Sequence, residues 1–169
     1  KGKKVKIRNP KDAVHLGIAY LSEDRKRDGL LLDQDVSFNT YIANLEKYSK
    51  FGVVLDKEIE KTVGDFVSAL SIKTPSLQQM TQFLSGGNQQ KVLVARWLCK
   101  KSDVIFFDEP TRGIDVGSKY EIYCLINELA ESGCAVVMIT SEMAEILGMS
   151  DRIMVMYEGN VVGELSAEE

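Results

Sequence analysis

Two adjacent carboxylates, Asp108 and Glu109, stand between a short apolar run and a proline. The run, Val104–Phe107, has the length of a buried strand, and Pro110 ends it. Parallel sheets bind ligands at the carboxyl ends of their strands, so this pair lies where a ligand is expected. Carboxylates there are suited to hold a hydrated Mg²⁺ ion and to position a water molecule, because Mg²⁺ prefers oxygen ligands and keeps part of its water shell. The alternative is a strand-to-loop turn whose carboxylates cap the next element.

A glycine pair supplies the second candidate site, within the sequence Leu-Ser-Gly-Gly-Asn-Gln-Gln at positions 84–90. Gly86 and Gly87 let the backbone approach a ligand closely, and Ser85 supplies a hydroxyl group. The segment 91–100 is apolar almost all round, which predicts a buried helix, and free amides at a helix start attract anions. This arrangement favours phosphate binding. The alternative is a serine cap followed by a glycine turn.

The surrounding sequence predicts an α/β fold that would position both segments. Its 169 residues are 44% hydrophobic and 27% charged, which is typical of one globular domain with a core. Apolar runs without alternation, joined by helical patterns, indicate a parallel sheet covered on both faces. We expect strands at 3–7, 18–21, 104–107, 135–139, 153–156 and 161–165, and helices at 11–16, 36–49, 56–70, 91–100, 119–130 and 142–147. The charged stretch at 22–29 is expected to be a solvated surface loop.

Composition argues against several functional classes. The net charge of −4 argues against a general nucleic-acid binder, whose affinity depends on neutralising phosphates. Three cysteines without a Cys-x-x-Cys pair fit a reducing compartment, and a single histidine cannot build a multi-histidine zinc site. No apolar run approaches the roughly 20 residues of a membrane span. The chain is therefore expected to be soluble and cytoplasmic, with no nucleic-acid partner.

Together, the candidate segments resemble the nucleotide-binding domain of ABC transporters. Residues 84–89 are similar to the signature motif of that family, Val104–Glu109 to its Walker B strand, and Gly113–Asp115 to its D-loop. More narrowly, the second ATPase half of bacterial ribose, galactose and xylose importers is similar to the segments 20–30, 84–92, 109–117 and 141–143. The resemblance implies the P-loop ATPase fold of this family, with a mostly parallel sheet and an inserted helical subdomain.

The resemblance also implies a function, which is ATP binding and hydrolysis with Mg²⁺ to power monosaccharide import. Members of this family work with a second ATPase domain, with two membrane subunits and, indirectly, with a periplasmic sugar-binding protein, at the cytoplasmic face of the membrane. The sequence does not state which sugar is carried. Two other functions are weighed against this one: an ABC ATPase outside transport, and a noncatalytic module that dimerises and docks.

Roles for individual residues follow from the same resemblance. Asp108 would hold Mg²⁺ through water, Glu109 would act as general base, and Asp115 would communicate across the dimer. The γ-phosphate of an ATP molecule bound mainly by the partner domain would be contacted by Ser85, Gly86, Gly87, Asn88 and Gln89. The sequence departs from the family at two further positions: Glu23 replaces a glutamine that senses the γ-phosphate, and Ser141 replaces the switch histidine.

These departures predict an asymmetric pair of sites, in which this half supplies its signature motif to a competent site and keeps a weaker site of its own. No two of the 13 glycines are five positions apart, so the phosphate-binding P-loop, Gly-x-x-x-x-Gly-Lys-Ser/Thr, is absent. We therefore expect a fragment that lacks the first strands and the P-loop and is inactive by itself. Its expected parts are an ATPase-core remnant at 1–23, a helical subdomain at 24–85, and the signature helix with the rest of the core at 86–169.

Overall fold

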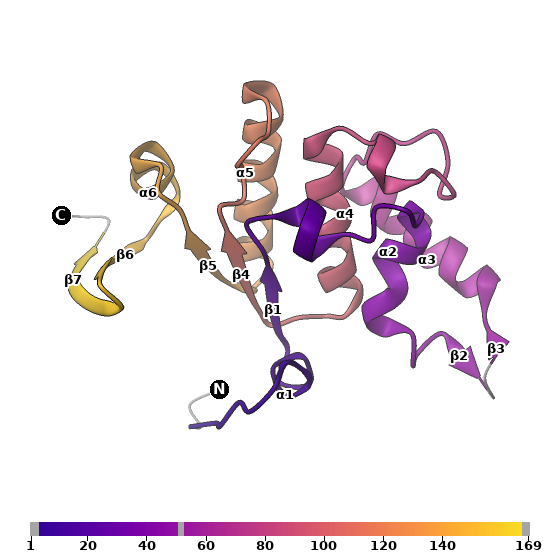
Figure 1. Ribbon diagram of the computed structural model, residues 1–169, viewed down its shortest axis with the longest axis horizontal. Helices are drawn as coiled ribbons and strands as arrows, with labels where there is room; N and C mark the ends of the chain where they lie inside the picture. The colour runs from indigo at the N-terminus through magenta and orange to yellow at the C-terminus, as the bar shows by residue number, and fades with distance from the viewer. Residues whose placement is uncertain (1–3, 51–52, 167–169) are drawn as a thin grey trace.

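A parallel sheet forms the centre of the molecule (Figure 1). The structure is a computed structural model and describes residues 4–50 and 53–166. Within that part, the three strands β1 (Ile18–Leu21), β4 (Val104–Asp108) and β5 (Ala135–Ile139) lie in the order β1-β4-β5 and pair in parallel. Parallel neighbours need long crossover connections, which the helical segments between these strands supply. The predicted α/β class is confirmed.

Helices and short strands fill the intervals and follow the sheet. In chain order they are α1 (Pro10–His15), η1 (Arg25–Gly29), α2 (Val36–Tyr41), η2 (Ile42–Asn44), β2 (Ser49–Lys50), β3 (Val53–Val54), α3 (Asp56–Ala69), η3 (Thr81–Phe83), α4 (Gly86–Cys99), α5 (Val116–Glu131), α6 (Met143–Met149), β6 (Arg152–Tyr157) and β7 (Asn160–Ser166). In Figure 1, α2, α3 and α4 lie together on the β1 side of the sheet. The charged stretch at 22–29 is not a plain loop, because it contains the π-helical turn η1.

Polar side chains set where several helices begin. The carboxylate of Asp35 accepts the backbone N–H of Phe38 at 2.6 Å at the start of α2, and that of Asp115 accepts the backbone N–H of Ser118 at 2.9 Å at the start of α5. Ser85 caps α4. Each cap satisfies an amide that the helix itself leaves unpaired.

One face of the sheet carries the core. Ala19 pairs with Ile105 and Leu21 with Phe107, and all four side chains are buried against residues of α4 and α5. On the opposite face, Tyr20 is 52% exposed. The expectation that helices cover both faces is therefore wrong for the described residues, because α4 and α5 both pack on the Ala19 face.

The helix α4 holds two cations inside this packing. Lys91 is 5% exposed, and its Nζ donates to Glu121 Oε2 of α5 at 2.8 Å and to the Ser71 carbonyl oxygen at 3.3 Å. One turn further on, Arg96 Nη1 donates to the Gly29 carbonyl oxygen at 2.7 Å. Burial lowers the pKa of Arg96 to about 10. A charge removed from water in this way needs several hydrogen bonds to offset its lost hydration.

Asn39 supplies most of these bonds to Arg96 and is itself fully buried. Its backbone carbonyl oxygen accepts from Arg96 Nε at 2.6 Å, and its side-chain Oδ1 accepts from Arg96 Nη2 at 2.8 Å. The same side chain accepts the Leu31 N–H at 2.9 Å and donates to the Leu31 carbonyl oxygen at 2.8 Å. Arg96 and Asn39 therefore join α4, α2 and the end of η1.

Two expected strands differ from the structure. The run at 153–156 does not extend the parallel sheet, because β6 pairs with β7 in a separate antiparallel sheet. The connecting residues Glu158 and Gly159 both have positive φ, 46° and 78°, which is the geometry of a two-residue hairpin turn. In the strand expected at 3–7, residue 3 lies outside the described part and residues 4–7 form no strand. An alternating pattern needs a neighbouring strand to pair with.

Replacing Asn39 with Ala tests this junction. The substitution leaves Arg96 Nη2 and the Leu31 N–H without their acceptor, so we expect a loss of about 3 kcal/mol in the free energy of unfolding, measured by urea denaturation. Asn127→Ala, at an exposed position of α5, is the matched control and should change stability by less than about 0.5 kcal/mol. Equal effects of the two substitutions would contradict the role of Asn39.

Candidate functional site

The predicted strand-end residues lie at one edge of the sheet. The strands β1, β4 and β5 are parallel and paired, so the segments that follow them emerge at the same edge. Glu23 follows β1, Asp108 ends β4, Glu109 comes next, and Ser141 follows β5. The fold therefore gathers four residues at one edge, although the first, Glu23, and the last, Ser141, are more than 100 positions apart in the chain.

Asp108 shares this edge with a residue that the sequence analysis missed. The Tyr20 hydroxyl donates a hydrogen bond to Asp108 Oδ2. This bond is the main cause that raises the pKa of Tyr20, with burial and the Asp108 charge adding to it. Tyr20 alternates with the buried Ala19 and Leu21 along β1, so its place on the Asp108 face of the sheet could have been read from the strand period.

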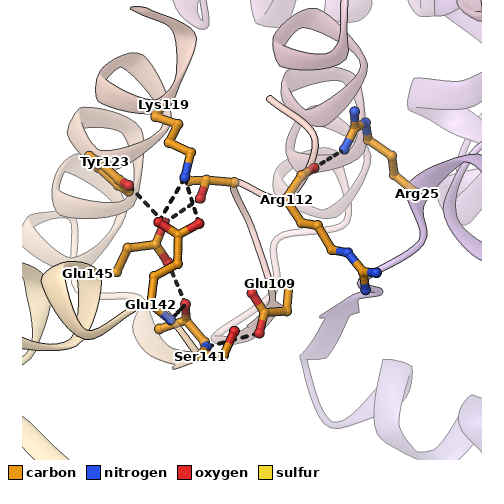
Figure 2. Close-up of polar contacts among 10 residues, drawn as sticks. Arg25, Glu109, Arg112, Lys119, Tyr123, Ser141, Glu142 and Glu145 are labelled. Carbon is orange, nitrogen blue, oxygen red and sulfur yellow. Dashed lines mark hydrogen bonds and ion pairs between the residues drawn. The ribbon is translucent and has the colours of Figure 1, made fainter. Parts of the chain in front are cut away.

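Glu109 bridges two strand ends. Its backbone N–H donates to the Ile139 carbonyl oxygen at 2.8 Å, and its Oε1 accepts the backbone N–H of Ser141 at 2.9 Å (Figure 2). The φ of Glu109 is 46°, a left-handed conformation that few residues other than glycine adopt. The predicted general base, Glu109, and the residue at the switch position, Ser141, are thus in direct contact through the amide of Ser141.

Glu23 has a cation beside it. Its carboxylate forms an ion pair with Arg112, in the loop that follows β4. An open hollow of about 590 Å³ lies here, lined by Tyr20, Ser22, Glu23, Asp24, Arg25, Lys26, Arg27, Asp28, Asp108, Arg112 and Gly113. The negative charge of Glu23 is therefore balanced within the chain.

A buried carboxylate, Glu145, fixes the segment around Ser141. Glu145 is 3% exposed and accepts hydroxyl hydrogen bonds from Thr111, from Thr140 at 2.7 Å and from Tyr123 at 2.8 Å. Burial works to raise the pKa of Glu145, but these hydrogen bonds and the nearby Lys119 outweigh it, so the pKa lies below its ordinary value. The sequence analysis missed Glu145, although an acidic residue in the short helical pattern at 142–147 was a visible signal.

The second group of predicted residues lies at the start of α4. Ser85 is exposed, and its hydroxyl oxygen accepts from Asn88 Nδ2 at 2.8 Å. Asn88 Oδ1 in turn accepts the Lys73 N–H at 2.7 Å. Gln89 is 2% exposed, and its Nε2 donates to the Thr81 carbonyl oxygen at 3.0 Å. Ser85 thus faces solvent, whereas Gln89 lies inside the protein.

The two glycines of this turn are in close contact with the same chain. A Cβ atom on Gly86 would lie 2.6 Å from Arg25 Nη2, and one on Gly87 would lie 2.9 Å from Ser118 Cβ. Side chains cannot fit at those distances unless their neighbours move. Both glycines therefore have a packing role beside the phosphate-binding role that the sequence predicts.

Asp115 completes this second group. It is exposed and caps α5, and its hydrogen bonds with Ser118 lower its pKa. The loop that carries it begins at Gly113, whose carbonyl oxygen lies 3.2 Å from the Cβ position of Gly86. The structure therefore brings the predicted residues together in two groups, one at the strand ends and one at the start of α4.

Among the residues that it describes, the structure contains neither a cluster of metal-binding side chains nor a membrane-spanning helix. Among residues 4–50 and 53–166, no group of three or more His, Cys, Asp or Glu side chains is placed to hold a metal ion. Asp108 alone still fits Mg²⁺, because that ion is bound through one or two carboxylates, water and substrate phosphates. In the same part of the chain, no helix combines the length and apolar character that a bilayer crossing requires.

The fold is that of an ATP-binding cassette. Residues 3–112 match the family model described as ABC transporter, and the chain belongs to that family. Among its relatives are sugar import ATP-binding proteins. The ribose import ATP-binding protein of Clostridium tetani and the xylose import ATP-binding protein of Thermoanaerobacter pseudethanolicus are each 52% identical over 168 residues. In both comparisons 99% of this chain is matched, but the chain spans only 33% of the relative.

Solved structures agree with this fold. A crystal structure of the ADP conformation of an ATP-binding cassette of an ABC transporter gives a TM-score of 0.79 at 22% identity, over 99% of this chain and 68% of that one. The dimeric structure of a post-hydrolysis state of another ATP-binding cassette, bound to ADP and Pi, gives 0.75 at 22% identity, over 95% and 68%. At this identity the likeness shows the fold alone.

The lowered pKa of Glu145 predicts a pH-dependent stability. Ionised Glu145 stabilises the folded state fully above its ordinary pKa of 4.5, and this contribution is lost as the pH falls through the lower folded pKa. Glu145→Gln should therefore lower the free energy of unfolding by about 2 kcal/mol at neutral pH, and the difference from the parent should shrink at about pH 3. Urea denaturation at both pH values measures it. Glu128→Gln, on the exposed side of α5, is the control, and a Glu145→Gln effect that grows in acid would contradict the assignment.

Proposed function

We propose that this chain is the ATP-binding part of a bacterial monosaccharide importer, and that it binds and hydrolyses ATP at an interface with a second ATPase domain. The names and 52% identity of the ribose and xylose import relatives support the sugar class. The observation that carries the proposal is the separation of the candidate residues into two groups, since a nucleotide held between two domains uses strand ends of one and the signature turn of the other.

The turn at Ser85–Gly87 would serve the partner domain's nucleotide. Ser85 is exposed at the start of a 14-residue helix, where the first backbone amides have no partner within the helix. Such a helix start attracts a phosphate group through these amides and the helix dipole. Asn88 would orient the Ser85 hydroxyl, to which it is hydrogen-bonded, and Gln89 would support the turn from inside the protein.

The strand-end group would serve a nucleotide on this chain. Glu109 would act as general base toward the attacking water, a role worth about 10² to 10⁴ in rate. The Ser141 amide, which donates to Glu109 Oε1, orients that carboxylate. Asp108 would hold Mg²⁺ through water, and the ion would supply positive charge against the phosphates. Asp115, exposed beside the signature turn, would report the state of one site to the other.

This second site would be the weaker of the two. Ser141 cannot provide an imidazole or a cation to the γ-phosphate. Glu23, a carboxylate paired with Arg112, only accepts hydrogen bonds and cannot donate one as a glutamine does. Loss of a contact to a charged group costs about 1.5 to 3 kcal/mol. The importer would then depend mainly on the other site, to which this chain contributes its signature turn.

The remaining surface would face the transporter. The segment 24–85, which includes α2 and α3, would be the helical subdomain that docks on the membrane subunits, while 1–23 and 86–169 belong to the ATPase core. A periplasmic sugar-binding protein would act on the importer without touching this chain. The complex would sit at the cytoplasmic face of the membrane.

Two substitutions in the full-length ATPase, assembled with its membrane subunits, test this assignment. Ser85→Arg places a cation and bulk where the partner's γ-phosphate would lie, so transport should be abolished. Glu109→Gln removes only the base of the weaker site, so measurable ATPase activity should remain. Sugar uptake and phosphate release are the two readouts.

Ser132→Arg, at the exposed end of α5, and Glu128→Gln are the matched controls and should leave both readouts near the parent values. Equal loss from Ser85→Arg and Glu109→Gln would refute the asymmetry of the two sites. If neither substitution changed ATPase activity or uptake, the chain would be the noncatalytic docking module instead.

A further inference from the structure

Arg25 is buried although it lies in the most charged stretch of the chain. It is 8% exposed, whereas its neighbours Lys26 and Arg27 in η1 are exposed. Asp24 produces this turn, because its carboxylate accepts the backbone N–H groups of Lys26 and Arg27, each at 3.1 Å. The sequence predicts a solvated basic triplet here, and Arg25 departs from that prediction because the capped turn directs it inward.

The guanidinium of Arg25 holds the loop that follows β4. Its Nη1 donates to the Arg112 carbonyl oxygen at 2.7 Å (Figure 2). Its Nη2 donates to the Gly113 carbonyl oxygen at 3.2 Å. A planar fork with fixed donors can bridge two successive carbonyls, which a single ammonium cannot do in the same geometry. Two residues earlier, Glu23 pairs with the side chain of Arg112. The loops after β1 and β4 are therefore joined at two points.

The same guanidinium also meets the start of α4. A Cβ atom on Gly86 would lie 2.6 Å from Arg25 Nη2, so the first residue of the helix packs directly against the guanidinium group. On the other side, Gly87 packs against Ser118 of α5. The turn that carries Ser85 is thus enclosed between Arg25 and α5.

Burying this side chain is costly. Burial lowers the pKa of Arg25, and its Nε has no hydrogen-bond partner among the residues that the structure describes. An apolar side chain of similar volume would fill the same space without a desolvation penalty. The arginine is therefore better explained by the two carbonyls that it positions than by its contribution to the core.

We propose that Arg25 is a positioning residue that fixes the signature turn at Ser85–Gly87 relative to the Arg112–Asp115 loop, so that both meet a nucleotide on the partner domain together. Arg25 acts through these contacts and not as a ligand of that nucleotide, because its Nη1 and Nη2 donate to the Arg112 and Gly113 carbonyl oxygens. The inference rests on the proposed function, because it gives the turn a ligand. It assigns a role within that site to a residue outside the signature motif, the Walker B strand and the D-loop.

The test uses the full-length ATPase assembled with its membrane subunits. Arg25→Met removes both carbonyl contacts, and a displaced turn should lower kcat for ATP hydrolysis by about 10- to 100-fold. KM for ATP should stay within about twofold, because most contacts to the nucleotide come from the partner domain. Arg152→Met, whose parent side chain is 67% exposed on β6, is the control and should leave kcat unchanged.

Rates are measured well below the melting temperature and per mole of folded complex, so a purely structural role would lower the melting temperature without lowering kcat. Arg25→Lys keeps the charge but cannot bridge the two carbonyls, and it should also lower kcat; it carries the test if Arg25→Met does not assemble. Parent-like kcat in the variant that assembles would overturn the proposal.

A double-mutant cycle with Gly86→Ala separates the contact from unrelated effects. If both residues act through one contact, the Arg25→Met and Gly86→Ala losses in kcat should not multiply, and the double variant should resemble the worse single variant. Multiplicative losses would overturn the proposal. Ser85→Arg is measured beside them: if it leaves transport intact, the proposed function itself has failed, whereas loss of transport with a parent-like Arg25→Met defeats only the role of Arg25.

Discussion

The burial of two cations in α4 constrains the rest of the molecule. Lys91 and Arg96 lie on a helix that is enclosed along most of its length, so each must find oxygen partners on the elements around it. Those partners come from α5, from α2 and from the end of η1. The helix can therefore take only one orientation relative to its neighbours, and the turn at its start, which carries Ser85, is oriented with it.

The strand-end residues depend on a different kind of contact. Parallel pairing brings β1, β4 and β5 to one edge, but side chains set the loops beyond it: Glu109 holds the Ser141 amide, and Glu145 gathers hydroxyls from three segments. These carboxylates accept their hydrogen bonds mainly from backbone amides and neutral hydroxyls. Positive charge at this edge comes from Arg112, which pairs with Glu23, and from Lys119, which pairs with Glu142 at 2.6 Å.

The sequence predicts an element of the structure correctly where a local pattern of residues determines that element. The strands at 18–21 and 135–139 have the predicted bounds because continuous apolar runs of that length are buried, and the segment before 91–100 does begin a helix at a serine cap. Tyr20, Arg25 and Glu145 were missed because each has at least one partner far away in the chain: Asp108 is 88 residues from Tyr20, Arg112 is 87 from Arg25, and Thr111 is 34 from Glu145. The hairpin of β6 and β7 was missed for a related reason, since apolar character alone does not reveal strand direction.

The left-handed backbone at Glu109 has an evolutionary consequence. That conformation costs a residue with a side chain about 1 to 2 kcal/mol, and glycine would avoid most of it. A laboratory selection for heat resistance would set two effects against each other at position 109, because glycine relaxes the backbone but loses the hydrogen bond from the Ser141 amide, which is worth about 1.5 to 3 kcal/mol. Such a selection would therefore not replace this glutamate by itself, although its backbone is strained.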